Sequence, residues 1–428
     1  MIKIKRIISP RGSITVPGDK SISHRAVMMA SIARGKSRLK NVLLGQDCAS
    51  TIDAFRRMGI SIDIAGDTVY VEGRGLKGLS CPDGELYLGN SGTTIRLLSG
   101  ILAGQGFEAL LTGDSSLLQR PMKRVIKPLR LMGVDISGAG GGDLAPIRIK
   151  GPCALKAIDY MTEVASAQVK SAIMFAALYA KGRTTVTEPY TSRDHTERMF
   201  RFFGIDIEKK GLSVSVCGAQ DMELAPRDID IPGDISSAAF FMALGALSEG
   251  ACIRIDNCGL NPTRAGMINV LKDMGADIEI IQGSDYFEPA GSIIIRYSQL
   301  RPIKIAKHDL PLMIDEIPLI ALCATQAKGI SVIEDVSELR VKETDRAQAI
   351  MTNLKGFGAD LHMNGNNLII KGPTSLKGVS VQSYNDHRMA MMSVIAGAVS
   401  RGVSHVSGAG CIDVSFPGFL DTLSSLTK

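Results

Sequence analysis

Tryptophan is absent from this sequence, and the aromatic residues together make up only 5% of its 428 residues. The 49 basic and 43 acidic residues give a net charge of +6, and the basic residues are spread along the chain. Nucleic-acid-binding proteins usually cluster their lysines and arginines and add aromatic side chains on which bases stack. The composition therefore argues against a nucleic-acid partner and suits a small anionic substrate better.

Paired cysteines and long apolar runs are also missing. The eight cysteines and six histidines are scattered, with no Cys-x-x-Cys pair, so we expect reduced thiols and no metal site. No apolar run approaches the about 20 residues that a membrane helix needs, and the N-terminal segment MIKIKRIISP lacks the apolar core of a signal peptide. We therefore expect a cytoplasmic protein with no membrane partner.

What the sequence does contain is an internal repeat. The segment that begins at Pro17, PGDKSISHRAVMMASIARG, resembles the segment that begins at Pro232, PGDISSAAFFMALGALSEG. The two segments begin 215 residues apart, which is half the chain, and share Pro-Gly-Asp, a following serine and a closing glycine. A chain of this length also suits two domains of about 200 residues each. The repeat predicts two similar halves.

Each half divides into three similar units. In each unit an apolar helix precedes a strand, and a second helix that stops at a glycine precedes alternating strands. The apolar helices begin near Ser21, Ser91, Ser166, Ser236, Asp315 and Asp386. Because they are almost wholly apolar, we expect them to be buried. The predicted fold class is α/β (α+β repeats): two domains, each of three βαβαββ units with buried parallel helices surrounded by sheets, an inside-out α/β barrel.

The starts of these helices carry more polar and cationic residues than a helix cap needs. If the three buried helices in a domain run parallel, their N-termini meet on one face and form an anion site. The richest starts are residues 18–25 (GDKSISHR), 89–96 (GNSGTTIR) and 385–388 (NDHR), and residues 340–346 (RVKETDR), which follow the fifth apolar helix, are similarly rich. Each of these starts, taken alone, is also compatible with a solvated cap or a salt-bridged surface helix.

Two further starts are interpreted differently. Residues 234–237 carry no cation, and we interpret that start as structural. Asp315 and Glu316 open the fifth apolar helix, and capping accounts for only one of these two acids. Which of them is free to transfer a proton stays open at this point.

Read together and in order, the motifs resemble the pattern of the 5-enolpyruvylshikimate-3-phosphate synthases, within the enolpyruvyl transferase family. These motifs are PGDKSISHR, GNSGTTIR, QRPM, ASAQVKSA, TSRDHTERM, NPTRAG, LRVKETDR and NDHRMAM. The resemblance covers nearly the whole chain. It implies an enzyme that condenses shikimate 3-phosphate with phosphoenolpyruvate and releases phosphate, on the route to chorismate and the aromatic amino acids. It also implies no cofactor, and we expect a monomer that is a target of glyphosate.

The resemblance further implies how the chain divides into domains. We expect the chain to cross between domains at the two Pro-Gly-Asp segments. One predicted domain comprises residues 1–15 and 231–428 and holds both termini. The other is an inserted domain of residues 16–230 on the shikimate-phosphate side, with the cleft between them.

The family's pattern also implies the site residues. Shikimate 3-phosphate would be bound by Lys20, Ser21, Arg25, Ser166, Ala167, Gln168, Arg193, Asp315 and Lys342. Phosphoenolpyruvate would be bound by Lys20, Asn90, Gly92, Arg120, Gln168, Lys342, Arg346 and Arg388. The substrates together carry a charge of about −5 to −6, so many cations, Arg96 among them, are a physical requirement of this chemistry.

The implied catalytic residues are Asp315, Glu343, Lys342 and Lys20. The substrate 5-hydroxyl attacks C2 of the enolpyruvyl group while C3 is protonated, and the tetrahedral intermediate then expels phosphate. Asp315 would accept the hydroxyl proton, and either Glu343 or Lys342 would protonate C3. Two positions depart from the pattern of some members: Val414 stands where they carry lysine, and Glu338 where they carry asparagine.

Three alternatives were weighed against this resemblance. A UDP-N-acetylglucosamine enolpyruvyl transferase typically opens with Lys-Asn-Ala and carries a reactive loop cysteine, whereas this chain has Lys20-Ser21 and no cysteine between Cys81 and Cys153. An RNA 3′-phosphate cyclase shares related repeats, but the low aromatic content and the lack of a histidine nucleophile motif argue against it. A phosphate-binding protein without activity would leave Asp315 and Glu343 unexplained.

Overall fold

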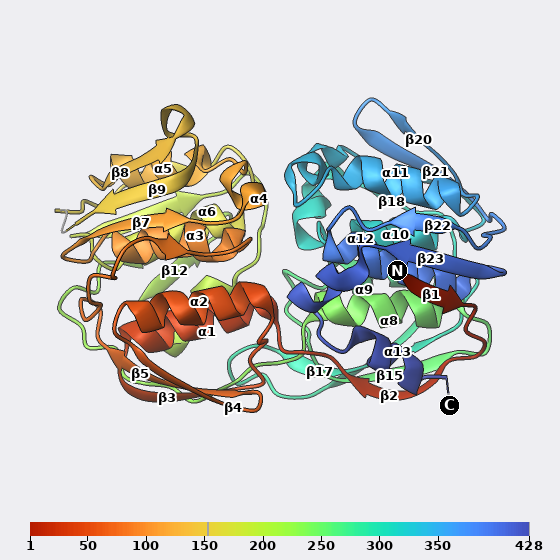
Figure 1. Ribbon diagram of the computed structural model, residues 1–428, viewed down its shortest axis with the longest axis horizontal. Helices are drawn as coiled ribbons and strands as arrows, with labels where there is room; N and C mark the ends of the chain where they lie inside the picture. Colours follow the sequence, from red (N-terminus) through yellow and green to blue (C-terminus); the bar gives the residue numbers. More distant parts are fainter. Residues whose placement is uncertain (152–153, 428) are drawn as a thin grey trace. The chain divides into compact units, whose positions relative to one another are not determined.

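The computed structural model describes residues 1–151 and 154–427. The chain divides into two compact units, coloured along the sequence in Figure 1. Unit 1 comprises Met1–Pro17 and Pro232–Lys428, and unit 2 comprises Gly18–Ile231. The chain therefore passes between the units at the two Pro-Gly-Asp segments that begin the internal repeat.

Unit 2 contains three four-stranded sheets among its described residues. In hydrogen-bonded order, the first is β14 (Ile229–Asp230), β3 (Arg34–Lys40), β5 (Thr68–Arg74) and β4 (Ser61–Ala65). The second is β6 (Leu86–Tyr87), β7 (Glu108–Thr112), β9 (Leu144–Lys150) and β8 (Asp135–Ala139). The third is β10 (Asp159–Met161), β11 (Arg183–Thr187), β13 (Ser213–Cys217) and β12 (Ile207–Lys210). In each sheet the first pair is parallel and the others are antiparallel.

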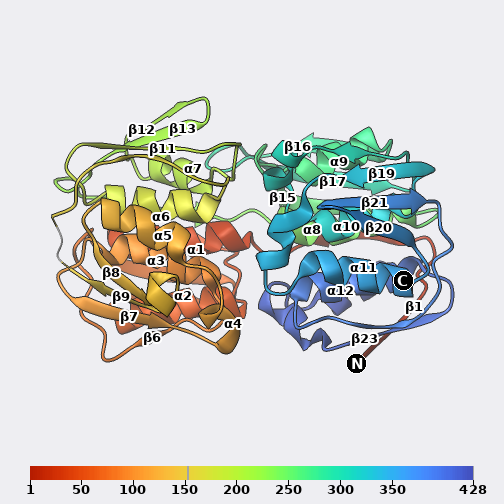
Figure 2. The ribbon, with the colours of Figure 1, turned by 90° about the horizontal axis from the view of Figure 1, so that it is seen from above.

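The core of unit 2 is built on three helices that the sheets surround. They are α1 (Lys20–Ile32), α3 (Gly92–Leu102) and α6 (Ala167–Ala177), and α3 contacts both of the others. Figure 2 shows them side by side within the unit. The remaining helices are α2 (Gln46–Arg57), α4 (Ser115–Leu118), α5 (Lys123–Leu131) and α7 (His195–Phe202), with a 3₁₀ turn η1 (Gly140–Gly142). Helices α2, α5 and α7 each bury one face, as amphipathic helices do.

Unit 1 repeats this arrangement with two four-stranded sheets and one of three strands among its described residues. The first is β16 (Asp277–Gln282), β17 (Ala290–Arg296), β15 (Cys252–Gly259) and β2 (Arg11–Thr15). The second is β18 (Lys304–Ile305), β19 (Gly329–Ile333), β21 (Asn367–Gly372) and β20 (Asp360–Asn364). The third is β1 (Ile2–Lys5), β23 (Val403–Ser407) and β22 (Ser380–Gln382), so the N-terminal strand completes a sheet from the C-terminal end of the chain.

The buried helices of unit 1 are α8 (Ile235–Leu247), α10 (Ile317–Ala324) and α12 (His387–Val399), and each contacts the other two. Outside them lie α9 (Gly266–Asp273), α11 (Arg346–Gly356) and α13 (Phe419–Ser425), with 3₁₀ segments η2 (Lys307–Leu312), η3 (Val336–Val341) and η4 (Ala409–Val414). Phe416 and Phe419 pack edge-on against Phe241 and Phe240 of α8, which fixes the C-terminal segment to the core. Aromatic pairs in this geometry stabilise a core beyond the area they bury.

Helix ends follow the local sequence. Asp19, Ser91, Ser166, Asp234 and Asp386 each accept a hydrogen bond from a backbone N–H of the first turn that they precede. In five of the α/β repeats the second helix ends at a glycine with positive φ, as predicted. The φ values lie between 84° and 95° for Gly59, Gly133, Gly204, Gly275 and Gly358. The starts of all six buried helices lie within two residues of their predicted positions.

The predicted fold class is therefore confirmed. Each of the two compact units consists of three similar α/β repeats, and mixed open sheets surround the buried helices. In the described part of the chain, no helix is both long and apolar enough to cross a membrane.

Candidate active site

In unit 2, hydrogen bonds join the first two turns of the three buried helices. Arg25 of α1 donates from Nη2 to Ser171 Oγ of α6 at 2.7 Å. Gln168 of α6 donates from Nε2 to Thr93 Oγ1 of α3 at 3.0 Å. The three N-termini therefore lie at the same end of the unit, and the helices run parallel as predicted. Their aligned dipoles and backbone N–H groups favour an anion at this end.

The start of α1 holds three of the predicted residues. Lys20 lies at the first position, and its Nζ is 2.9 Å from Asp47 Oδ2 at the start of α2. Ser21 is half-buried, and its carbonyl oxygen accepts a hydrogen bond from Arg25 Nη1 at 3.0 Å. Arg25 itself is buried, and its Nε donates to Thr196 Oγ1 at 2.7 Å. Its guanidinium is thus held in one orientation by neutral acceptors.

The start of α3 brings together Asn90, Gly92 and two arginines. Arg120 donates to Asn90 Oδ1, and Asn90 donates in turn to Asp114 Oδ2 at 3.0 Å. A Cβ at Gly92 would lie 2.9 Å from Arg120 Nη1 and 3.2 Å from Arg96 Nη1. Arg96 also donates to Gln168 Oε1 at 2.5 Å. A side chain at position 92 would therefore displace the ends of two flexible arginine side chains.

The start of α6 carries the remaining predicted residues of unit 2. Ser166 caps the helix, its Oγ accepting the N–H of Val169 at 3.4 Å, and Ala167 is the first helical residue. The N–H of Ser166 donates to Glu188 Oε1 at 3.0 Å. Arg193 is half-buried in the segment that leads into α7. Through these contacts the loop that carries Arg193 is tied to the start of α6.

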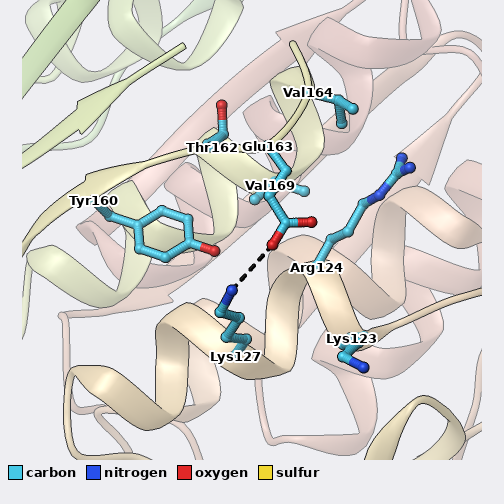
Figure 3. A pocket seen from close by; sticks show the side chains of 8 residues that line it. All are labelled: Lys123, Arg124, Lys127, Tyr160, Thr162, Glu163, Val164 and Val169. Carbon is cyan, nitrogen blue, oxygen red and sulfur yellow. Dashed lines mark hydrogen bonds and ion pairs between the residues drawn. The ribbon is translucent and has the colours of Figure 1, made fainter. Parts of the chain in front are cut away.

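A separate pocket in unit 2 is drawn in Figure 3. Lys123, Arg124 and Lys127 of α5 line one side, and the segment around Glu163 lines the other. The Lys127 Nζ lies 3.0 Å from Glu163 Oε1, so a carboxylate of the protein already compensates this lysine. The pocket contains none of the residues that the sequence pattern predicted for the site.

In unit 1, three cations surround one carboxylate. Asp315 Oδ1 lies 3.1 Å from Arg346 Nη1 and 3.7 Å from Lys342 Nζ, and Asp315 Oδ2 lies 3.6 Å from Arg388 Nη2. Asp315 comes just before α10, Lys342 just after η3, Arg346 begins α11 and Arg388 lies in the first turn of α12. The structure thus brings together four predicted residues that are up to 73 positions apart in the chain.

Arg346 is the centre of this cluster. Its side chain is buried, its Nε donates to Asp386 Oδ2 at 2.7 Å, and its Nη2 donates to Glu343. Burial by itself would lower the pKa of the guanidinium, but the charges of Asp386, Glu343 and Asp315 outweigh it and hold that pKa above its usual range. Arg346 therefore remains a fixed positive charge, and it holds Glu343 beside Asp315.

The structure distinguishes Asp315 from Glu316. Glu316 is 1% exposed, accepts a hydrogen bond from Ser236 and lies with Oε1 3.7 Å from Arg388 Nη1. The Asp315 side chain is 12% exposed. Glu316 is therefore an internal group that orients its neighbours, whereas Asp315 is the acid of the pair that solvent reaches.

Arg264 was not predicted to belong to the site. It is buried and donates from Nη2 to Ser236 Oγ at 2.5 Å and to Asp234 Oδ1 at 3.3 Å. Arg264 thus brings a cation to the start of α8, which has none of its own. Ser236 at this start also donates to Glu316, and Glu316 lies close to Arg388. The signal that could have identified Arg264 was its place in NPTRAG, a motif of the resemblance to which no role was given.

No group of histidine, cysteine and acidic side chains able to hold a metal occurs among the described residues.

Comparisons with known proteins agree with the fold and the motifs. The family model described as EPSP synthase (3-phosphoshikimate 1-carboxyvinyltransferase) matches residues 5–423. The 3-phosphoshikimate 1-carboxyvinyltransferase of Bacillus thuringiensis (strain Al Hakam) is 49% identical, over 99% of this chain and 100% of that protein. The protein of the same name from Geobacillus kaustophilus (strain HTA426) is 50% identical, over 98% of both chains.

Solved structures give the same result. The EPSP synthase of Acinetobacter baumannii superposes with a TM-score of 0.89 at 41% identity, covering 99% of this chain and 98% of that one. The enolpyruvyl transferase NikO of Streptomyces tendae superposes with a TM-score of 0.78 at 17% identity, over 99% and 96% of the two chains, and supports the fold alone. The chain therefore belongs to the EPSP synthase (3-phosphoshikimate 1-carboxyvinyltransferase) family.

Proposed function

We propose that this chain transfers the enolpyruvyl group of phosphoenolpyruvate to the 5-hydroxyl of shikimate 3-phosphate, releasing phosphate and giving 5-enolpyruvylshikimate 3-phosphate. Membership of the family supports this reaction. The observation that carries the proposal is the cluster in which Lys342, Arg346 and Arg388 surround Asp315, with Glu343 on Arg346. A site that only bound phosphate would need these cations, but it would gain nothing from a solvent-accessible carboxylate among them.

The charge of the substrates accounts for the number of cations. Two phosphates and two carboxylates bring about −5 to −6, which would cost several kcal/mol per ion on desolvation if it were not matched. The cations that we assign to the substrates are Lys20, Arg25, Arg96, Arg120, Arg193, Lys342, Arg346 and Arg388. The positive ends of the buried helices in unit 2 add to this field.

We assign shikimate 3-phosphate mainly to unit 2, where the first turns of α1 and α6 offer hydroxyls, N–H groups and Arg25. The proposed ligands there are Lys20, Ser21, Arg25, Ser166, Ala167, Gln168 and Arg193, with Asp315 and Lys342 from unit 1. The hydrogen bonds between Arg25 and Ser171 and between Gln168 and Thr93 support this assignment, because they preorganise the binding groups before the ligand arrives.

We assign phosphoenolpyruvate to the start of α3 and to the arginines of unit 1. The proposed ligands are Lys20, Asn90, Gly92, Arg120, Gln168, Lys342, Arg346 and Arg388. The contact of Arg120 with Asn90 and its approach to Gly92 support a small, strongly cationic subsite, in which a side chain at position 92 would displace Arg120. Planar guanidinium groups suit phosphate and carboxylate because they can donate two parallel hydrogen bonds.

In the proposed mechanism, Asp315 accepts the proton of the 5-hydroxyl as its oxygen bonds to C2 of phosphoenolpyruvate. Glu343 or Lys342 gives a proton to C3, so that a tetrahedral intermediate forms with no net change in protons. In the second step the group that protonated C3 takes a proton back from C3, the C2–O bond to phosphate breaks, and Asp315 gives its proton to the departing phosphate. Positioned acid and base groups of this kind typically each contribute 10² to 10⁴ in rate, a range of about 3–5 kcal/mol.

Because the reaction joins its two substrates, we propose that residues of both units act on one pair of molecules. We further propose that the enzyme works in the cytoplasm as a monomer and without a cofactor.

The direct test is phosphate release from phosphoenolpyruvate, measured with and without shikimate 3-phosphate. We expect release only with this acceptor, and the same assay with UDP-N-acetylglucosamine as acceptor should give none. Release with UDP-N-acetylglucosamine, or release that does not depend on any acceptor, would overturn the proposal.

A further inference from the structure

Unit 2 contains a buried lysine between two glutamates that the proposed mechanism does not use. Lys170 Nζ of α6 lies 2.7 Å from Glu188 Oε2, just after β11, and 2.8 Å from Glu197 Oε1 of α7. The three side chains are 5%, 4% and 1% exposed. One positive and two negative charges are thus enclosed where three different elements meet.

This triad costs free energy to bury. Desolvation costs several kcal/mol per ion, and well-packed apolar side chains of the same volume often stabilise a fold as well or better. Burial alone would lower the pKa of Lys170, but the charges of Glu197 and Glu188 outweigh it and raise that pKa, so the lysine stays protonated. A gain in folding stability therefore does not explain why these three charges are buried. A role in positioning residues of the substrate site would explain it.

The contacts of the two glutamates lead to the proposed shikimate-phosphate ligands. Glu188 accepts with Oε1 from the N–H of Ser166 at 3.0 Å and with Oε2 from Ser192 Oγ at 2.8 Å, and Ser192 directly precedes Arg193. Glu197 follows Thr196, whose Oγ1 accepts from Arg25 Nε at 2.7 Å. Lys170 precedes Ser171, which accepts from Arg25 Nη2.

We propose that Lys170 is a positioning residue for the phosphate of shikimate 3-phosphate, acting through Glu188 and Glu197 on Ser166, Arg193 and Arg25. This inference rests on the proposed function. By drawing both glutamates to one point, the lysine fixes the start of α6, the loop before α7 and the orientation of Arg25 relative to one another. The start of α3, assigned to phosphoenolpyruvate, is reached only indirectly, through the hydrogen bonds of Gln168 with Thr93 and Arg96.

The test compares Lys170→Met with the wild-type enzyme in the phosphate-release assay. We expect KM for shikimate 3-phosphate to rise at least about tenfold, with KM for phosphoenolpyruvate and kcat within about threefold, because loss of uniform binding raises KM alone. Lys304→Met is the matched control. Lys304 also forms an ion pair at 3.0 Å, with Glu334, but in unit 1 with its side chain 71% exposed, and its loss should change neither KM.

A second variant guards against misfolding, because Lys170→Met leaves two carboxylates buried without their cation. Lys170→Met with Glu197→Gln keeps the net charge of the triad at −1, and should restore the melting temperature while KM for shikimate 3-phosphate remains above the wild-type value. Wild-type KM for shikimate 3-phosphate in the folded double variant, or an equal rise of both KM values, would overturn the inference. An inactive wild-type enzyme would overturn the proposed function and the inference with it.

Discussion

At the scale of single residues, Asp315 is the group on which the proposed chemistry depends most. Asp315→Asn keeps the size of the side chain, but it removes the negative charge that faces three cations and cannot accept the hydroxyl proton. We expect kcat to fall by about 10² to 10⁴, the usual contribution of a positioned base, with smaller changes in both KM values. Steady-state kinetics would check this, and a variant with wild-type kcat would exclude Asp315 as the base.

Arg120 should behave in the opposite way. Its guanidinium contacts Asn90 beside the glycine of α3, where we place phosphoenolpyruvate. Arg120→Ala would leave anionic charge of the substrate unpaired, so we expect KM for phosphoenolpyruvate to rise by about tenfold or more. KM for shikimate 3-phosphate provides the internal control and should change little. A selective rise in KM for shikimate 3-phosphate would contradict the assignment.

Gly92 should decide how the site distinguishes inhibitor from substrate. Glyphosate is expected from the family to occupy the phosphoenolpyruvate subsite, and we expect the wild-type enzyme to be inhibited. A Cβ at position 92 would lie 2.9 Å from Arg120 Nη1, so this flexible arginine would have to shift. Glyphosate is longer than phosphoenolpyruvate, and the intrusion should therefore weaken the inhibitor more.

The measurement for Gly92→Ala is the ratio of the glyphosate inhibition constant to KM for phosphoenolpyruvate. We expect this ratio to rise relative to the wild-type enzyme, with both enzymes assayed at the same saturation by phosphoenolpyruvate. An unchanged ratio would mean that position 92 serves only the turn before α3 and that the subsite lies elsewhere.

At the scale of elements, a buried hydrogen-bonded chain connects three helices. His24 Nδ1 of α1 lies 2.7 Å from Thr51 Oγ1 of α2, and this hydroxyl lies 2.7 Å from Thr94 Oγ1 of α3. The pKa of His24 is lowered from 6.5 to about 3, chiefly by burial; the charges of Asp47 and Asp19 oppose this shift, and those of Lys20 and Arg25 add to it. His24 is therefore neutral in the folded enzyme at all working pH values.

This shift predicts how stability depends on pH. Between pH 6.5 and pH 3 the unfolded chain binds a proton at His24 and the folded chain does not, so the free energy of unfolding falls as pH falls through this window. By about pH 4.5, two pH units below the unfolded pKa, the loss from this group should reach about 3 kcal/mol. Urea unfolding of wild type and His24→Gln at both ends of this range would check it. The glutamine variant should lose less stability on acidification; equal losses would mean that His24 is protonated in the folded state.

The helices also show why local sequence predicts elements well. A cap such as Asp19 or Ser91 bonds to an N–H three residues away, and a glycine such as Gly59 ends a helix through its own φ. These effects act within one turn, and their signals are therefore present in a short stretch of sequence. Their agreement with the structure reflects that short range.

At the scale of the whole molecule, the proposed reaction requires both units to act on the same substrates. Each unit carries several of the assigned cations, and bound substrate anions would attract both sets. We expect Asp315→Asn, mixed with both substrates, to show a smaller radius of gyration in small-angle scattering than the same variant without ligand. The variant is used because it should hold both substrates without consuming them. An unchanged radius with both substrates bound would contradict ligand-driven closure.

The sequence by itself determined the repeat, the fold class, the helix starts and the family, because each depends on residue types and spacings within short segments. It also placed Asp315, Lys342, Arg346 and Arg388 among the candidates, through motifs of the resemblance. It could not distinguish Asp315 from Glu316, since adjacent acids at one helix start look alike in a sequence.

Only the tertiary structure decided which of these groups are buried and what they touch. It buried Glu316 against Ser236, brought Arg264 to the start of α8, and enclosed Lys170 between Glu188 and Glu197. The partners in these contacts are between 18 and 80 positions apart in the chain. These contacts depend on how the helices pack against the sheets, and a local sequence pattern does not predict them. Because desolvation and charge pairing act through space rather than along the chain, the electrostatics of the site became visible only in the folded protein.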